Sequence, residues 1–363
     1  MQRDIKIPTD DLNKSDYESF IIVADVGGTH TTIAIAGIRN STSFDIILKH
    51  IYPTKDITAF ETVLNDTLQK AKEEYDIEIS KACIGAAGPV LGNREYVKLT
   101  NADLEINTSE ILNRTMLNKI ILLNDFEVIG YSLDLLDLNE DVMKLPHLEE
   151  DLKENSTTSN FAVMGAGTGL GMCITPYDAE KQLHIPFPSE GGHIEFAPNN
   201  RLEMKLAKFI KKRGYQKDLH PDMESVVSGK GIETIYDFLM SLQLFKTKIT
   251  KQISLLEEDE KLAEIEANYE RDKTCKKTID MFITFYARAA KNLALMSKCY
   301  GGLFIAGNIS LKNIEFLKDR KFMQEFEEHN KRPDILKKIP VYVIINRDVS
   351  LYGCCNAAIN FFS

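Results

Sequence analysis

Three glycine-rich stretches lie far apart in the chain: Asp25-Val-Gly-Gly-Thr29, Gly165-Ala-Gly-Thr-Gly-Leu-Gly171 and Ile305-Ala-Gly-Asn308. Each follows a short apolar run that is typical of a β-strand, at Ile21–Ala24, Phe161–Met164 and Gly302–Ile305. Glycine lets backbone N–H groups come close to a phosphate, and a following threonine adds a hydroxyl donor. Two strand-borne Gly-Thr loops and a third strand–glycine element predict a phosphoryl-transfer enzyme with its cleft between two lobes.

The composition limits the partners of the protein. Its 363 residues are enough for two lobes, and the net charge of −10 argues against nucleic acid or an anionic membrane as the main partner. ATP remains compatible, because phosphates are held locally by backbone donors and Mg²⁺. Neither a membrane-spanning run nor a signal peptide is recognisable. The six cysteines form no CxxC pair, which favours reduced thiols in a cytoplasmic protein.

The order of predicted elements indicates a duplicated fold. Strands at 20–26, 31–38 and 43–50 precede a helix at 56–75 and a strand at 82–86, and a helix at 108–116 leads to a strand at 119–123. The pattern then restarts with strands at 161–165 and 170–175. Two hairpins that each present a glycine loop predict an α/β, two-lobed, actin-like or ribonuclease H-like fold with mixed sheets.

The expected domain organisation has three parts. Residues 1–18 are predicted to be a flexible extension, 19–125 with 350–363 a smaller α/β lobe, and 126–349 a larger α/β lobe. The polar segment 134–160 is expected to be an exposed connection, and the charged segment 246–273 a solvated helical insertion. Apolar residues at helical spacing predict a buried helix at Asp280–Cys299, whose core-facing residues are Met281, Phe282, Phe285, Ala289, Leu293 and Met296.

Two aspartates follow predicted strands. Asp25, directly before Gly27-Gly28-Thr29, suits Mg²⁺ held through water beside the phosphates, although a loop aspartate capping its own turn is the alternative. Asn124-Asp125 ends the strand at 119–123, where Asp125 can take a proton from a hydroxyl and Asn124 can hold neighbouring hydroxyls. Taken alone, this pair is explained better as a helix N-cap.

Other candidate residues carry polar groups that suit a sugar. Ser189-Glu190-Gly-Gly-His193 brings a carboxylate and an imidazole together if the glycines turn the chain, and Glu224 can add a second carboxylate. One histidine without nearby cysteines makes a zinc site a poor interpretation, and a surface turn is the simpler alternative. Thr100 and Asn101 flank a short hairpin and are either substrate contacts or turn residues.

Together and in order, these motifs resemble the bacterial-type glucokinase family of the hexokinase/actin-like ATPase superfamily. The resemblance runs from about residue 21 to 360, and its most specific string is Ser189-Glu-Gly-Gly-His-Ile-Glu-Phe-Ala-Pro198. Asp25–Thr29 and Gly165–Gly171 resemble the two phosphate motifs, and Asn124-Asp125-Phe126-Glu127 resembles the catalytic strand end. Glu224-Ser-Val-Val-Ser-Gly229 resembles a sugar-binding segment, and 301–307 resembles the adenosine region.

The resemblance implies a role for each candidate. Asp125 would be the general base on the 6-hydroxyl of D-glucose. Sugar contacts would come from Thr100, Asn101, Asn124, Glu190, His193 and Glu224. The nucleotide would be bound by Asp25, with Mg²⁺ through water, and by Gly27, Gly28, Thr29, Gly165, Gly167, Thr168, Gly169 and Gly307.

The implied activity is transfer of the γ-phosphate of Mg-ATP to D-glucose, the first step of glycolysis, by a cytoplasmic homodimer that binds neither nucleic acid nor membrane. His30 and Thr32 stand where the family usually has Asn and Arg, Asn308 where a glycine is usual, and Leu104 where a Trp is expected. These departures leave open a same-fold kinase for another hexose or phosphate donor. A non-catalytic sugar-sensing regulator and a hydrolase of the same fold are the more distant alternatives.

Overall fold

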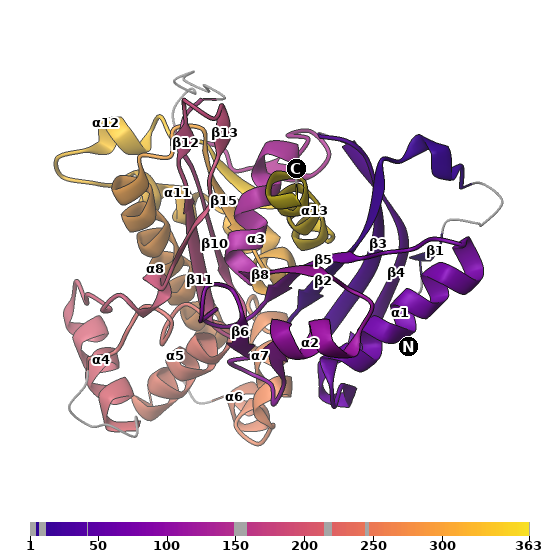
Figure 1. Ribbon diagram of the computed structural model, residues 1–363. Helices are drawn as coiled ribbons and strands as arrows, with labels where there is room; N and C mark the ends of the chain where they lie inside the picture. Colours follow the sequence, from indigo (N-terminus) through magenta and orange to yellow (C-terminus); the bar gives the residue numbers. More distant parts are fainter. Residues whose placement is uncertain are drawn as a thin grey trace. The chain divides into compact units, whose positions relative to one another are not determined.

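The computed structural model describes residues 5–6, 12–41, 43–148, 158–213, 220–243 and 247–362 (Figure 1). The chain forms two compact units, a first unit of Met1–Leu136 with Asn346–Ser363 and a second unit of Asp137–Ile345. The first unit extends beyond the expected boundary at residue 125 because the helix α3 (Asp125–Ser132) packs closely on α13 (Val349–Phe362). A Cβ atom at Gly353 would lie 1.9 Å from the Val128 carbonyl oxygen, so glycine permits this contact.

A six-stranded mixed sheet forms the centre of the first unit. Its strands are, in order, β1 (Ile5–Lys6), β4 (Ser43–Pro53), β3 (His30–Asn40), β2 (Ser19–Val26), β5 (Lys81–Ala86) and β8 (Lys119–Asn124). The strands β2, β3 and β4 pair antiparallel, whereas β2, β5 and β8 run parallel. The carboxyl ends of the three parallel strands therefore share one edge of the sheet, where ligands of open α/β sheets usually bind.

Both faces of this sheet are buried, as its apolar strands predict. On β2, Ile22, Ala24 and Val26 belong to one core cluster, which also contains buried residues of α1 (Phe60–Tyr75) and Ile111 of α2 (Thr108–Arg114). The alternate residues Ile21 and Val23 belong to a second cluster with residues of α3 and α13. A small hairpin of β6 (Tyr96–Lys98) and β7 (Glu105–Asn107) follows β5.

The sheet of the second unit repeats this arrangement. Its order is β14 (Phe187–Ser189), β11 (Leu170–Thr175), β10 (Phe161–Ala166), β15 (Gly302–Ala306), β16 (Val341–Ile344) and β9 (Val142–Lys144). The strands β10 and β11 form an antiparallel hairpin, and β10, β15 and β16 run parallel. Each unit therefore has a hairpin with a glycine loop beside two further parallel strands, which confirms the predicted duplication.

Helices make up most of the second unit between residues 201 and 336. They are α4 (Arg201–Arg213), α5 (Gly229–Ser241), α6 (Lys248–Ile253), α7 (Glu258–Ala267), α8 (Lys273–Ser297), α9 (Asn308–Lys312), α10 (Ile314–Lys318), α11 (Arg320–Glu327) and α12 (Pro333–Leu336). The predicted helix at 280–299 is longer, because Asp272 caps α8 through hydrogen bonds to the N–H groups of Thr274 and Cys275. Met296 was expected in the core, but its exposed fraction is 60%.

Several segments that were expected to be flexible, exposed or solvated pair with or pack against the rest of their unit. Of residues 1–18, Ile5 and Lys6 pair with β4, and Lys14 forms an ion pair of 2.7 Å with Asp76, while 1–4 and 7–11 lie outside the described residues. In the segment 134–160, β9 joins the sheet edge, and 149–157 lie outside the described residues. In 246–273, Ile253 and Ile265 are buried in the core, so α6 and α7 pack onto the unit; residue 246 is not described.

All six cysteines are free and buried, consistent with the predicted reduced thiols. Within the described parts of the chain, no helix combines the length and the apolar character that a membrane span requires.

Candidate functional site

Asp25 and Asp125 lie at the same edge of the first sheet. Asp25 is aligned with Gly85 on β5, and Gly85 is aligned with Leu123 on β8, two residues before Asp125. Neighbouring strands are about 4.8 Å apart and β5 lies between β2 and β8, so about two strand spacings separate the two carboxylates, and the charge of Asp25 still acts on Asp125. Gly85 between them gives α3 room, because a Cβ atom there would lie 2.8 Å from Val128 Cγ2.

Asn124 caps α3 and holds the Asp125 carboxylate. Its Oδ1 accepts hydrogen bonds from the N–H groups of Phe126 and Glu127 at 3.0 and 3.3 Å. Its Nδ2 donates to the Gly88 carbonyl at 3.2 Å and to Asp125 Oδ1 at 2.9 Å. The N-cap interpretation is therefore correct for Asn124, and the cap also orients the aspartate.

The second oxygen of Asp125 takes no part in these bonds. Oδ1 accepts from Asn124 and from the Phe126 N–H at 3.0 Å, which leaves Oδ2 available to a substrate. Burial and the nearby negative charge of Asp25 raise the pKa of Asp125 to about 7, against the opposing hydrogen bonds. A carboxylate with a pKa near neutrality has the properties of a general base.

Asp25 has few compensating partners. Burial raises its pKa to about 6, although a hydrogen bond with the Ser350 hydroxyl of α13 opposes the shift. Its cross-strand partner is Thr32, which brings no charge to the pair. No cation acts on Asp25 among the described residues, and a desolvated carboxylate in this state suits a hydrated Mg²⁺ that arrives with a nucleotide. The described residues contain no group of three or more His, Cys, Asp or Glu that would bind a metal alone.

The first glycine loop, Gly27–Thr29, is held from one side by Thr54. The Thr54 hydroxyl donates to the Gly27 carbonyl at 2.7 Å, and its N–H donates to the Thr29 carbonyl at 3.0 Å. Thr54 is 1% exposed. Both bonds use carbonyl oxygens of the loop as acceptors. The Gly27 N–H donates to the His30 carbonyl at 3.0 Å. Among the described hydrogen bonds, the backbone N–H groups that remain available at this turn are therefore those of Gly28 and Thr29. Thr54 lies 25 residues from Thr29 in a separate turn, and no local motif indicated its role.

Asn101 packs against the same loop. A Cβ atom at Gly28 would lie 3.0 Å from Asn101 Cβ. The neighbouring Thr100 N–H donates to the Ala87 carbonyl at 3.1 Å, which fastens the hairpin to the end of β5. Both side chains are exposed. Three predicted groups, the phosphate loop, the catalytic strand end and the sugar-side hairpin, are therefore adjacent within the first unit.

The second glycine loop consists of residues 167–169 between β10 and β11. Gly165 lies inside β10, paired with Gly171 and Ala306, so its backbone belongs to the sheet rather than to the turn. The Gly167 N–H donates to the Gly169 carbonyl at 2.8 Å, and the Gly229 N–H at the start of α5 donates to the Gly167 carbonyl at 2.9 Å. Thr168 at the tip is exposed.

Glu224 contacts this second loop directly. Its Oε2 accepts a hydrogen bond of 2.8 Å from the Leu170 N–H. A Cβ atom at Gly169 would lie 2.5 Å from the same oxygen, and one at Gly192 would lie 2.0 Å from the Leu170 carbonyl oxygen. The predicted phosphate loop and two predicted sugar-binding segments therefore meet around Leu170.

His193 and Glu190 lie in the turn that includes Gly191–His193. The Nε2 atom of His193 is 3.8 Å from Glu190 Oε2, so the two side chains converge as predicted. His193 Nδ1 is 2.9 Å from Oδ2 of Asp222, which sequence reasoning did not identify. The hydrogen bond to Asp222 raises the pKa of His193, although burial opposes it.

Gly307 adopts a conformation that favours glycine. Its φ is +93°, and a Cβ atom would lie 2.7 Å from the Ala166 carbonyl oxygen. Nearby, the buried Tyr286 hydroxyl accepts from the Ala166 N–H at 3.1 Å and bonds to Ser310 Oγ at 2.9 Å. This network joins β10, α8 and α9 at the end of the strand that leads into the second glycine loop.

The positions that depart from the family pattern differ in their surroundings. His30 begins β3 and is exposed, and Asn308 begins α9 next to Gly307. Leu104 is buried in the core cluster that contains Leu99, so it fills an apolar position.

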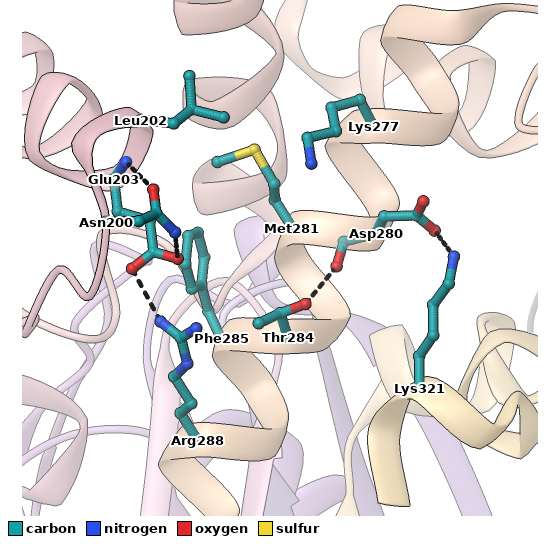
Figure 2. Close-up of a pocket in the computed structure, with 10 residues that line it drawn as sticks. All are labelled: Asn200, Leu202, Glu203, Lys277, Asp280, Met281, Thr284, Phe285, Arg288 and Lys321. Atoms are coloured by element: carbon teal, nitrogen blue, oxygen red, sulfur yellow. Dashed lines mark hydrogen bonds and ion pairs between the residues drawn. The ribbon is translucent and has the colours of Figure 1, made fainter. Parts of the chain in front are cut away.

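The second unit also contains a cavity of about 320 Å³, which is lined mainly by residues of α4, α8 and α11 (Figure 2). None of the predicted site residues lines it. Its charged groups are mostly paired with one another: Arg288 contacts Glu203 at 2.8 Å, and Lys321 contacts Asp280 at 2.7 Å. These pairs connect α8 with α4 and α11, and we interpret the cavity as part of that helix packing.

Comparison with known proteins found similar sequences and structures. The Glucokinase family model matches residues 22–360. A glucokinase of Trichormus variabilis is 31% identical over 94% of this chain and 99% of its own length. A glucokinase crystal structure from an Antarctic psychrotroph is 27% identical, with a TM-score of 0.75 over 94% of this chain and 99% of that one.

The fold is also shared with a more distant protein. The glucokinase of Balamuthia mandrillaris, solved with glucose, is 22% identical and superposes with a TM-score of 0.77 over 93% of this chain and 92% of its own. The predicted actin-like α/β fold with mixed sheets is confirmed. The match to the family model over most of the length shows that this chain belongs to the glucokinase family.

Proposed function

We propose that the protein is an ATP-dependent glucokinase that transfers the γ-phosphate of Mg-ATP to the 6-hydroxyl of D-glucose. The observation that carries the proposal is the hydrogen bonding and the raised pKa of Asp125 in a chain of this family. One of its oxygens is fixed by Asn124, the other is available, and its pKa is raised to about 7. The relatives are named for this activity, and the Balamuthia structure contains glucose.

In the proposed reaction, Asp125 acts as the general base. Its Oδ2 accepts the proton of the 6-hydroxyl while that oxygen bonds to the γ-phosphorus and the bond to ADP breaks. General-base catalysis contributes on the order of 10²–10⁴-fold. Burial near Asp25 keeps the carboxylate basic enough for this role, and the Phe126 N–H keeps Oδ1 fixed during the transfer.

Backbone groups and Asp25 would hold the nucleotide. The N–H groups at Gly28, Thr29, Thr168 and Gly169 and the two threonine hydroxyls are the proposed phosphate donors, and Gly307 would border the adenosine. Mg²⁺ would supply charge neutralisation on the phosphates. Asp25 would accept hydrogen bonds from water bound to the Mg²⁺, since no cation acts on its desolvated carboxylate in the part of the chain that the structure describes.

Hydroxyls of the sugar would be held by Glu190, His193 and Glu224. Glu224 uses Oε2 for Leu170 and has Oε1 available. Asn101 and Thr100, both exposed beside the first loop, are proposed further contacts. Asn124 would act mainly through Asp125, because its own amide is already engaged by the protein.

The test is formation of glucose 6-phosphate from glucose with Mg-ATP, comparing wild type with Asp125→Asn. We expect turnover to fall by at least about 10²-fold while calorimetry still detects glucose binding. Asp334→Asn is the control, because this aspartate is 63% exposed on α12 and pairs only with Arg332 among the contacts described. Full activity of Asp125→Asn overturns the assignment of the base.

A panel of donors and acceptors separates the alternatives. Mg-ADP and polyphosphate are tested as donors, and fructose and mannose as acceptors, since His30, Thr32 and Asn308 depart from the family pattern. If turnover is faster with another donor than with Mg-ATP, that donor replaces ATP in the proposal. If turnover is faster with another hexose than with glucose, that hexose replaces glucose. Glucose-dependent thermal stabilisation without turnover on any donor instead indicates a sugar-sensing regulator.

We propose in addition that the protein is a cytoplasmic homodimer. The resemblance to the family suggests the dimer, and six free buried cysteines fit a reducing compartment. Light scattering of the purified protein tests the dimer, and a monomer mass over the working concentration range contradicts it.

A further inference from the structure

The position of His193 is set by a short backbone ladder. The Phe196 N–H donates to the Pro221 carbonyl at 2.8 Å, the Met223 N–H to the Ile194 carbonyl at 2.8 Å, and the Glu224 N–H to the Gly192 carbonyl at 2.9 Å. These bonds pair residues 192–196 with 221–224. The register brings the imidazole of His193 beside Asp222, although the two residues are 29 positions apart in the chain.

Both oxygens of Asp222 are engaged. Oδ2 lies 2.9 Å from His193 Nδ1. Oδ1 accepts hydrogen bonds from the Ser225 N–H at 2.9 Å and from the Ser225 hydroxyl at 2.5 Å. Burial alone would raise the pKa of Asp222, but the hydrogen bonds from Ser225 and His193 outweigh it and lower the pKa. Asp222 is therefore an ionised and rigid acceptor.

The ionised acceptor at Nδ1 determines which ring nitrogen of His193 is available to a ligand. Nδ1 carries its proton toward Asp222, so Nε2 is the atom available to a ligand. The charged groups that act on the ring are all carboxylates: Glu190 in its own turn, and Asp222 and Glu224 in the segment paired with it. All three favour the protonated imidazole.

The neighbouring groups explain why a donor is needed here. The carboxylate oxygens of Glu190 and Glu224 serve as hydrogen-bond acceptors. A sugar hydroxyl has one proton to give and two lone pairs to share. Carboxylates alone leave those lone pairs without a partner, and a protonated Nε2 supplies one.

We propose that Asp222 is a positioning residue for sugar recognition: its bond to Nδ1 orients the His193 ring, so that Nε2–H donates to a hydroxyl oxygen of the bound sugar. This inference rests on the proposed function. It assigns to Asp222 a role that acts through His193 and not through contact with the sugar.

The experiment compares Asp222→Asn, Asp222→Glu and Ser225→Ala with wild type. The control is Asp178→Asn, which removes a carboxylate that also accepts two backbone N–H bonds, from Glu180 and Lys181, but contacts no histidine among the described interactions. Long-range ¹H–¹⁵N spectra follow the tautomer and titration of the His193 ring. Calorimetry measures glucose binding, and initial rates separate KM for glucose, KM for ATP and kcat.

We expect Asp222→Asn to lower the pKa of the His193 ring and to raise KM for glucose by about tenfold, because the sugar then loses a charged hydrogen-bond donor held in place. The KM for ATP should stay within about twofold of wild type. Glucose affinity in the wild type should fall as pH rises through the ring pKa, and in the variant this fall should occur at lower pH. Asp222→Glu should restore part of the affinity, and Ser225→Ala should show a smaller effect in the same direction.

Two results overturn the proposal. The first is a ring whose pKa and tautomer are unchanged in Asp222→Asn. The second is a ring that titrates at lower pH while glucose binds as tightly as in wild type. A wild-type protein that binds no hexose overturns the proposed function itself, and the ring spectra then still report whether Asp222 holds His193.

Discussion

The Leu170 backbone N–H donates a hydrogen bond of 2.8 Å to Oε2 of Glu224, which joins the end of a glycine loop to a carboxylate from a segment more than 50 residues away. Gly169, the preceding residue, has no room for a side chain because the same oxygen occupies that space. The residue proposed to bind sugar and the loop proposed to bind phosphate are thus a single packed feature. A change in the loop should therefore alter sugar binding.

Gly169→Ala and Gly167→Ala test this coupling within one loop. A Cβ atom at Gly169 would lie 2.5 Å from Glu224 Oε2, whereas one at Gly167 meets no atom within 4 Å. We expect Gly169→Ala to displace the carboxylate and to raise KM for glucose by about tenfold. In Gly167→Ala, KM for glucose should stay near wild type, and steady-state kinetics measures both. Equal glucose KM values in the two variants would contradict the coupling.

The acid limb of the activity profile should follow Asp125. Its pKa is raised to about 7 by burial and then by the charge of Asp25, so activity should fall as pH drops below about 7. Asp25→Asn removes that charge and should move the midpoint of the remaining activity to lower pH, even though the overall rate falls. Rate measurements across pH with saturating substrates test this. Asp334→Asn should leave the midpoint unchanged, and an unchanged midpoint in Asp25→Asn would refute the electrostatic coupling.

The same carboxylates should make stability depend on pH. The folded-state pKa values of about 6 for Asp25 and about 7 for Asp125 exceed the unfolded value near 3.8. The stabilisation from proton binding is then fully present below about pH 4 and is lost as pH rises through 6 to 7. Asp125→Asn avoids this loss. It should be more stable than wild type at about pH 8, by up to roughly 4 kcal/mol and less where water reaches the carboxylate.

Urea denaturation at about pH 4 and pH 8 measures this difference. The advantage of Asp125→Asn should shrink toward zero at the lower pH, because both proteins then carry a neutral side chain. A constant difference at both values would assign the effect to packing instead of charge.

Thr54→Val tests the support of the first glycine loop. The variant loses the buried hydroxyl that donates to the Gly27 carbonyl at 2.7 Å. We expect KM for ATP to rise several-fold and stability to fall by about 1–3 kcal/mol, because a buried carbonyl loses its partner. Thr67→Val is the matched control, since its buried hydroxyl donates only within α1, to Val63 at 2.9 Å. Loss of ATP affinity in both variants would point to a general loss of stability.

Tyr286→Phe tests the network near the second glycine loop. The Ala166 N–H would lose its acceptor in a fully buried position, which should cost about 1–3 kcal/mol. Because Ala166 is the last residue of β10, KM for ATP should also rise. Tyr236→Phe removes another buried hydroxyl, whose contact with the Thr250 carbonyl is long at 3.4 Å, and should leave the kinetics unchanged. Thermal unfolding and ATP kinetics of both variants distinguish the local from the general effect.

Features that are local in the chain were predictable from the sequence. Apolar runs that end in Gly-Gly-Thr or Gly-Thr-Gly indicate a strand followed by a turn wherever they occur, because the side chains favour the sheet and the glycines end it. The restart of that pattern at Phe161 was enough to predict the duplicated sheets. Helical spacing likewise located α8, although it placed the exposed Met296 in the core.

Partners that come together only on folding were decided by the tertiary structure. Asp222, Thr54 and Tyr286 stand in no motif, and each acquires its contact from a segment that pairing or packing brings beside it. The sequence by itself determined which side chains can be proposed to bind phosphate and sugar. Tertiary structure decided their chemical state, because burial and neighbouring charge raise the pKa of Asp125, and both depend on atoms distant in the chain.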